Sequence, residues 1–286
     1  ARPVDTPVEL TSTAYYFFDA NIMEDVAGIL GKNRDAERYR RLAETIRASF
    51  IKKFYNPYNK TYGSQTGDCF SLYLGLVPEG DEQNVADSLA RDILDKHDGH
   101  HSTGVTGSLH LYWALGHFGY GDLAHKLLQN TTYPSIGYLF SLGATTLWES
   151  WGKRGGSLNH PMQGGFTVWF YQGIAGINPD PENPGFKHTI FRPPVRGNLD
   201  SAQARFRSPY GLITSEWSLT EENFNWNVSI PANTTATVYI PSQRSDAVTE
   251  SSMNAAHAEG VTYLRAEDGC SVYSIESGNY FFSCKE

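Results

Sequence analysis

The hydrophobic pattern of this chain changes its period once, across a segment rich in proline and glycine. Ahead of residue 178, apolar residues recur every three or four positions, as between Tyr39 and Phe50. Segment 178–185 reads Asn-Pro-Asp-Pro-Glu-Asn-Pro-Gly, which favours neither helix nor strand. Beyond it apolar and polar residues alternate. The change predicts two domains, a helical one over residues 1–180 and a β-sheet one over residues 181–286.

The helical part has enough periodic segments for about four helical hairpins. We expect helices over residues 15–30, 35–50, 66–76, 81–93, 104–115, 122–128 and 166–174. Leu42–Ile46 is echoed by Leu89–Ile93, and each copy leads into a turn of Ser, Thr and Gly. A repeat of helix pairs is typical of solenoids and toroids, and a closed toroid of six hairpins would need more chain ahead of Ala1.

The second part is predicted to form about eight short strands separated by turns, which indicates an antiparallel β-sandwich. The clearest strand is Phe224–Ile230, where alternation sends Phe224, Trp226 and Val228 inward and Asn227 outward.

Charge and hydropathy exclude some classes of partner. The 23 basic residues are outnumbered by 31 acidic ones, for a net charge of −8, and no basic run occurs, so we expect no nucleic-acid partner. No apolar stretch reaches the ~20 residues of a membrane span, so we expect no membrane partner. Nothing at residues 1–3 resembles a signal peptide.

Cysteines and glycosylation sequons favour a secreted, extracellular glycoprotein. Cys270 and Cys284 bracket a short strand-rich segment and are expected to form a disulfide. Cys69 is left over, either buried and inert or paired with chain outside this sequence. Four Asn-x-Ser/Thr sequons are candidate glycosylation sites, at Asn59, Asn130, Asn227 and Asn233.

The densest cluster of chemically distinctive residues is Gly143–Trp151, followed by Asn159–Gly165. One interpretation is structural: Thr146 and Glu149 have the spacing of a capping box, in which Glu149 would bond the Thr146 backbone N–H. The functional one is a carboxylate between Trp148 and Trp151, where indole faces stack on a sugar and the carboxylate activates water. A charged His160 nearby would lower the pKa of Glu149, whereas burial would raise it.

Other chemistry finds little support. Phosphate-binding, dinucleotide-binding and zinc motifs do not occur, so we expect no cofactor. His100 and His101 are adjacent and cannot both face one helical site, so we expect no metal there either. Asp68 follows a turn and is expected to be structural, while Glu24 and Asp25 lie in an ordinary helix.

Several stretches together resemble the microbial α-L-rhamnosidases of glycoside hydrolase family 78. The specific ones are Ala144–Glu149 (Ala-Thr-Thr-Leu-Trp-Glu) and Pro134–Tyr138 (Pro-Ser-Ile-Gly-Tyr). The supporting ones, matching in order and spacing, are 6–10, 13–15, 65–67, 103–107, 159–160, 175–177 and 184–186.

The resemblance implies part of a six-hairpin α/α toroid followed by a β-sandwich, and hydrolysis of terminal α-L-rhamnose with inversion. It implies that Glu149 is the general base and that His160 contacts the rhamnose. The family's general acid and its sugar-stacking Trp belong to motifs that this sequence lacks. By the family's order they precede Ala1, so we expect the N-terminal part of the same polypeptide as a partner, and no useful activity from these 286 residues alone.

Two alternatives stay open at this point. One is another toroid enzyme, either a glycosidase or a phosphorylase; a polysaccharide lyase of this architecture would favour a basic groove, which the net charge of −8 does not supply. The other is a non-catalytic carbohydrate-binding protein with Trp148 and Trp151 as its stacking platform.

Overall fold

The chain forms two compact units, residues 1–166 and 167–286. The structure is a computed structural model that describes residues 6–153, 156–192 and 198–285. The division falls earlier than the expected boundary at residue 180, and the carbonyls of Ile174 and Ala175 are bonded to the sheets of the second unit. Trp217 Nε1 donates to the Ile174 carbonyl at 2.7 Å, and Ser215 Oγ donates to the Ala175 carbonyl at 2.6 Å.

The first unit is helical. Its helices are α1 (Val8–Ile29), α2 (Asn33–Phe54), α3 (Gln65–Tyr73), α4 (Glu82–Arg91), η1 (Asp92–Lys96), α5 (Val105–His117), α6 (Gly121–Gln129), α7 (Ile136–Ser141) and η2 (Pro161–Gly165). All six helices expected before residue 160 are present. Five have bounds within a few residues of those expected, whereas α1 begins at Val8, seven residues before the expected start at Tyr15. Helix α7 was not predicted, because six residues are too few to show a period. Ser135 caps it by accepting a hydrogen bond from Tyr138 N at 3.0 Å.

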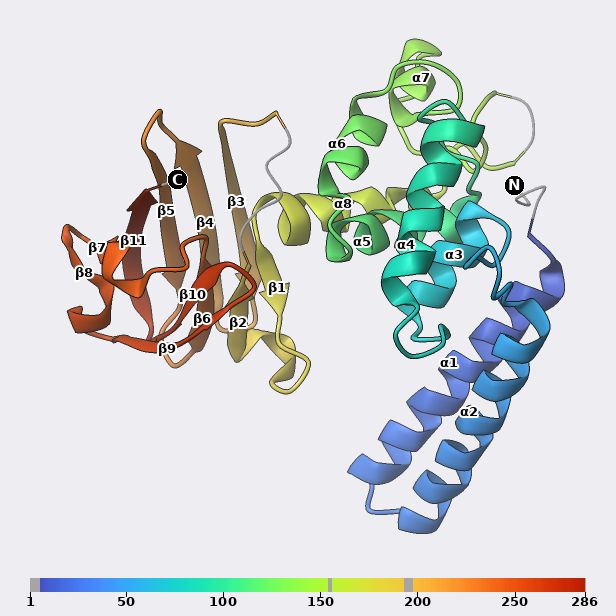
Figure 1. Cartoon of the computed structure of the whole chain (residues 1–286), viewed down its shortest axis with the longest axis horizontal. Helices are drawn as coiled ribbons and strands as arrows, with labels where there is room; N and C mark the ends of the chain where they lie inside the picture. Colours follow the sequence, from blue (N-terminus) through green and yellow to red (C-terminus); the bar gives the residue numbers. More distant parts are fainter. Residues whose placement is uncertain (1–5, 154–155, 193–197, 286) are drawn as a thin grey trace. The chain divides into compact units, whose positions relative to one another are not determined.

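Helices α1 and α2 pack side by side as a long hairpin (Figure 1). Apolar side chains of α1 occupy more than the face turned to α2. Leu10, Ala14 and Phe17 are buried, whereas a further set is exposed: Val8, Tyr15, Tyr16, Phe18, Ile22, Met23, Val26 and Ile29. Across the described residues, no helix is long and apolar enough to cross a membrane.

The second unit is a sandwich of two sheets, as predicted. One has the order β1-β2-β6-β10-β9 and the other β3-β4-β5-β11-β7-β8. The strands are β1 (Ile177–Pro179), β2 (His188–Phe191), β3 (Ser201–Ser208), β4 (Gly211–Leu219), β5 (Asn223–Ile230), β6 (Thr235–Ile240), β7 (Val248–Glu250), β8 (Met253–Asn254), β9 (Val261–Glu267), β10 (Cys270–Ile275) and β11 (Gly278–Lys285). Short helices α8 (Phe166–Trp169) and η3 (Phe170–Ile174) precede them, and η4 (Pro184–Phe186), η5 (Ser245–Ala247) and η6 (Ala255–His257) lie between strands. Pairing is antiparallel except between β2 and β6, which run parallel.

The core of the sandwich is rich in aromatic side chains. Trp217 and Trp226 are 0% exposed, and their indole N–H groups are satisfied by the Ile174 carbonyl and the Ser215 hydroxyl. The alternation predicted for Phe224–Ile230 is confirmed: Phe224, Trp226, Val228 and Ile230 are buried while Asn227 is exposed.

The predicted disulfide between Cys270 and Cys284 is wrong. The two thiols lie on β10 and β11, which belong to different sheets. Cys284 is part of the core between the sheets, whereas Cys270 packs with Tyr239 and Val272 in a separate small cluster. Proximity in sequence does not bring the two side chains to one face. Cys69 is buried as one alternative expected, and burial raises the pKa of its thiol, which keeps it inert.

Candidate active site

Glu149 lies in an irregular loop that folds back on itself. The two arms are joined by backbone hydrogen bonds, from Glu149 N to Ser157 O at 2.9 Å and from His160 N to Leu147 O at 2.7 Å. Residues 144–150 form no helix, so Glu149 does not cap Thr146, and the capping-box interpretation is wrong. The Thr146 hydroxyl instead donates to the Leu158 carbonyl at 2.5 Å, which adds a third bond between the arms.

The carboxylate of Glu149 is held by the opposite arm. Its Oε2 accepts a hydrogen bond from Ser157 N at 2.8 Å and lies 4.0 Å from His160 Nδ1. The Ser157 N–H is the main cause that holds the pKa of Glu149 below its usual range, and His160 contributes in the same direction. About a third of the Glu149 side chain, 31%, is exposed. The geometry gives a solvent-accessible carboxylate that is ionised at neutral pH.

Gly156 gives the loop its close fit around this carboxylate. Its φ of +91° is a conformation that side chains rarely allow, and a Cβ placed there would lie 2.6 Å from Glu149 Oε2. Gly152, on the same loop, has open space around it. Only glycine at position 156 lets the backbone approach Glu149 and present Ser157 N to it.

The residues around Glu149 are packed beneath the loop. Gln163, 1% exposed, donates from Nε2 to the Glu149 carbonyl at 3.2 Å. Trp151 Nε1 donates to the Thr103 carbonyl at 3.0 Å, and its ring lies 4.9 Å from that of His101. Trp148 and Trp151 are only 5% and 9% exposed, so the predicted sugar-stacking role for these two indoles is wrong. They are core residues that fix the loop.

The histidine pair at 100–101 is structural. His101 is buried, bonds Tyr112 OH at 3.0 Å through Nε2, and has a pKa lowered to about 4 because burial disfavours its charged form. His100 bonds the Thr132 hydroxyl through Nε2 at 2.7 Å. No cluster of three metal-ligating side chains occurs in the described part of the chain.

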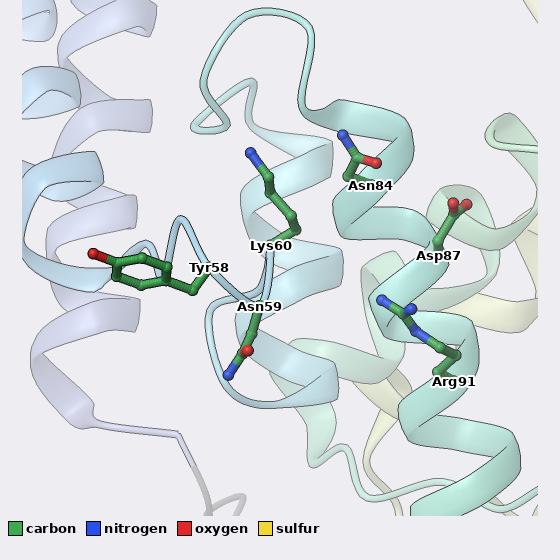
Figure 2. A pocket seen from close by; sticks show the side chains of 6 residues that line it. All are labelled: Tyr58, Asn59, Lys60, Asn84, Asp87 and Arg91. Carbon is green, nitrogen blue, oxygen red and sulfur yellow. The ribbon is translucent and has the colours of Figure 1, made fainter.

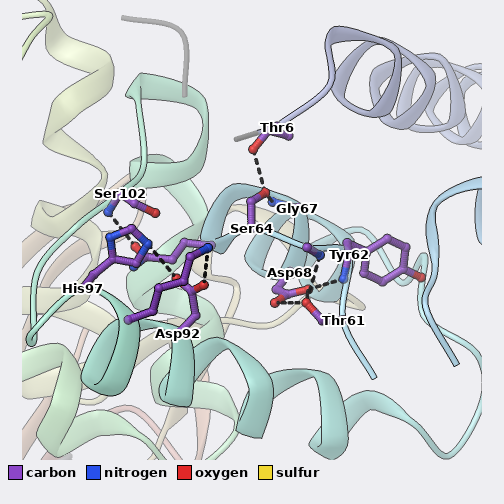
Figure 3. A network of polar contacts seen from close by, with 12 residues as sticks. Thr6, Thr61, Tyr62, Ser64, Gly67, Asp68, Asp92, His97 and Ser102 are labelled. Carbon is purple, nitrogen blue, oxygen red and sulfur yellow. Dashed lines mark hydrogen bonds and ion pairs between the residues drawn. The ribbon is translucent and has the colours of Figure 1, made fainter. Parts of the chain in front are cut away.

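Asp68 is a titratable group whose chemistry the sequence did not reveal. It is 1% exposed, bonded to the Thr61 hydroxyl at 2.8 and 2.9 Å and to Tyr62 N at 2.6 Å (Figure 3). Burial raises the pKa of Asp68 to about 7 in spite of these bonds. Its partners are all local, so its contacts support the expected structural role. The only signal in the sequence was its place in the first turn of α3, which says nothing about burial.

Among the four sequons, the side chains of Asn59, Asn227 and Asn233 are exposed. Asn130 is half-buried and donates from Nδ2 to the Gly99 carbonyl at 3.2 Å. Glycosylation at all four stays a prediction.

Two family models match consecutive parts of the chain. The model of the bacterial α-L-rhamnosidase six-hairpin glycosidase domain matches residues 2–174, and that of the bacterial α-L-rhamnosidase C-terminal domain matches residues 176–254. The chain therefore belongs to the bacterial α-L-rhamnosidase family. Its helical unit is part of a six-hairpin toroid, and the sandwich is the domain that follows it.

Individual relatives agree with this assignment. An α-L-rhamnosidase of Streptomyces avermitilis is 34% identical over 98% of this chain and 27% of its own length. Its crystal structure in complex with L-rhamnose has a TM-score of 0.86 and covers 98% of this chain and 27% of that one. The α-L-rhamnosidase structure from Dictyoglumus thermophilum has a TM-score of 0.87 at 35% identity, covering 97% of this chain and 32% of that one. The chain thus spans about a quarter to a third of the relatives it matches.

Proposed function

We propose that this chain is the C-terminal part of an α-L-rhamnosidase and supplies the general base, Glu149. The observation that carries the proposal is the Glu149 loop. It holds an accessible carboxylate with a lowered pKa beside His160, in a chain whose Streptomyces relative is described in complex with L-rhamnose.

The chemistry we propose is hydrolysis with inversion at the sugar carbon. The ionised Glu149 removes a proton from a water molecule, whose oxygen attacks the anomeric carbon as the glycosidic bond breaks. A separate carboxylic acid protonates the leaving oxygen, and in inverting enzymes it stands about 6.5–9.5 Å from the base. We assign to His160, whose backbone N bonds the Leu147 carbonyl and whose ring lies 4.0 Å from Glu149, a contact with a rhamnose hydroxyl.

We assign the general acid to the N-terminal part of the same polypeptide. None of the acidic residues discussed above fits the role: Asp68 is enclosed by its own loop, and Glu24 and Asp25 lie on α1. The exposed apolar side chains on α1 favour further helices packed against this helix. The relatives, three to four times longer than their matched parts, have chain enough to provide them.

A chimera tests the proposal. In the Streptomyces avermitilis enzyme, the part that aligns with this chain is replaced by this chain, and an aryl α-L-rhamnoside is the substrate. We expect the chimera to release L-rhamnose, first as the inverted β anomer by NMR, and the Glu149→Gln chimera to lose about 10²–10⁴-fold in kcat. The 286-residue chain alone is expected to show no turnover. Turnover by the chain alone, or full activity of the Glu149→Gln chimera, would contradict the proposal.

We also propose that the protein is secreted and carries glycans at the sequons. The exposure of Asn59, Asn227 and Asn233 supports this assignment. Intact-mass spectrometry of protein from the culture medium of its natural source, before and after deglycosylation, tests both points. An unmodified mass, or protein found only inside cells, would contradict it.

A further inference from the structure

The side chains that line a polar pocket of the helical unit diverge from one another. This pocket lies between the loop that joins α2 to α3 and helix α4. Figure 2 shows Tyr58 and Asn59 directed away from Asp87 and Arg91, so these side chains do not meet around one ligand. Polar contacts do converge beneath the Glu149 loop, where a single buried residue is bonded to both residues of the candidate site.

That residue is Gln163, which is bonded to His160 and to Glu149 through different groups. Its backbone N donates to the His160 carbonyl at 3.2 Å. Its side-chain Nε2 donates to the Glu149 carbonyl, also at 3.2 Å. A carbonyl oxygen only accepts, so the side-chain amide must turn its NH2 group towards Glu149. The bond to His160 could form with any residue except proline at position 163, whereas the bond to Glu149 requires a side chain with a donor.

The short helix η2 holds Gln163 in a fixed place. A Cβ added to Gly165 would lie 2.5 Å from Leu109 Cα, so η2 rests directly on the backbone of α5. On η2 itself, Met162 is 39% exposed and Gln163 only 1%, so the Gln163 side chain is directed into the protein. Its amide therefore ties the main chain of Glu149, in an irregular loop, to a segment that α5 supports.

Packing alone does not explain an amide at this position. The Gln163 Oε1 atom is buried and accepts no hydrogen bond from any residue that the structure describes. A buried acceptor without a partner costs stability, and an apolar side chain of similar size would avoid that cost. The bond that Nε2 makes to Glu149 is what the amide provides in return.

We propose that Gln163 is a positioning residue, which fixes the main chain of Glu149 so that its carboxylate stays aligned for proton removal from water. This inference rests on the proposed role of Glu149 as the general base. Gln163 acts through Glu149 and has no contact with the sugar in this proposal. Its loss should therefore slow the chemical step without weakening the binding of substrate.

Kinetics of the chimera with the Streptomyces avermitilis enzyme, on an aryl α-L-rhamnoside, test this role. Gln163→Met removes the donor and keeps a flexible side chain of similar length. The backbone bond to His160 survives, so KM should stay within about twofold, whereas kcat should fall about tenfold. The midpoint of thermal unfolding should change by less than about 2 °C, because the variant loses one hydrogen bond together with a buried acceptor that had no partner.

A double variant separates positioning from structural damage. In Glu149→Gln the base is already absent, so adding Gln163→Met should lower kcat by less than about a further twofold. The matched control is Gln172→Met, which makes the same chemical change on η3. Gln172 is half-buried, and none of the hydrogen bonds between described residues joins its side chain to Glu149 or His160. This control should keep kcat within about twofold.

Four results would overturn the inference and leave Glu149 as the base: an unchanged kcat in Gln163→Met, a loss that appears only as a raised KM, a further tenfold loss in the double variant, or an equal loss in Gln172→Met. Full activity of Glu149→Gln would instead contradict the proposed function, and this inference with it. Should the Gln163→Met chimera not fold, Gln163→Leu, which also lacks a donor, decides by the same measurements.

Discussion

Two carboxylates of the helical unit, Glu149 and Asp68, accept backbone N–H bonds in much the same way and differ in their ionisation. Glu149 Oε2 accepts from Ser157 N on an exposed loop, and the pKa of Glu149 is lowered. Asp68 Oδ1 accepts from Tyr62 N inside the fold, and burial raises the pKa of Asp68 to about 7. At the accessible group a hydrogen bond is the largest cause of the lowered pKa, whereas at the buried group desolvation outweighs the hydrogen bonds from Tyr62 and Thr61 and raises the pKa. The accessible group is suited to be a base at neutral pH, and the buried one is suited to hold a turn.

The largest effect is expected from changing the glycine that shapes the Glu149 loop. Gly156→Ala puts a Cβ 2.6 Å from Glu149 Oε2, in a backbone conformation that alanine avoids. Displacing the carboxylate by a fraction of an ångström to one ångström should lower kcat of the chimera about hundredfold. Steady-state kinetics of the chimera on an aryl rhamnoside measure this fall in kcat.

The matched control for that change is Gly152→Ala, on the same loop but with open space around the new Cβ. It should keep kcat within about twofold, since surface changes without new contacts have small effects. If Gly152→Ala and Gly156→Ala lowered kcat equally, the effect would come from adding any side chain to the loop and not from the close approach of Gly156 to Glu149.

A smaller effect, on stability, is expected at Asp68. Its folded-state pKa of about 7 lies above the 3.8 of an ordinary Asp, so the folded protein binds this proton more tightly than the unfolded chain. Asp68 therefore favours folding most below about pH 4, and this contribution, on the order of 4 kcal/mol for a shift of about three units, is lost as pH rises towards 7. Asp68→Asn cannot ionise and should remove this decline. Urea unfolding of the unchanged and Asp68→Asn chains at pH 4.5 and 7.5 measures the fall in the free energy of unfolding. An equal fall in both chains would contradict the raised pKa of Asp68.

The smallest effect concerns His160. When charged, it lowers the pKa of Glu149 from 4.0 Å away. His160→Ala removes that charge, so the pKa of Glu149 should rise and the acidic limb of the kcat/KM profile should move to higher pH. The Ser157 N–H bond remains, so part of the lowering of this pKa should persist. If His160→Ala raised KM but left the acidic limb where it is, His160 would contact the substrate without affecting the pKa of Glu149.

The sequence predicted the helices and strands that follow from hydrophobic periodicity. It did not predict the features that depend on contacts between residues far apart in the chain. Spacing alone predicted the helices between residues 15 and 129 and the strand Phe224–Ile230, but not the first two turns of α1, which begins at Val8. The separation of Cys270 from Cys284 depends on which sheet each strand joins, which spacing cannot tell. The sequence predicted Trp148 and Trp151 to be a stacking platform, and their burial, which spacing cannot reveal, makes them core residues.

For the site, the sequence singled out Glu149 and His160, and the structure places them 4.0 Å apart. It could not reveal that Ser157 and Gly156, on the returning arm of the loop, set the position of the carboxylate. Nor could it show that Asp68 is buried, because the sequence of a first helical turn is compatible with either face.

The contrast between the two carboxylates is tested most directly by titrating both in one protein. In the chain labelled with ¹³C at its side-chain carboxyl groups, the signals lost in Glu149→Gln and Asp68→Asn identify the two residues. The structure predicts a midpoint below 4.5 for Glu149 and about 7 for Asp68. A Glu149 midpoint above 4.5, or an Asp68 midpoint at the ordinary value of 3.8, would contradict the account of which carboxylate is held ready as a base.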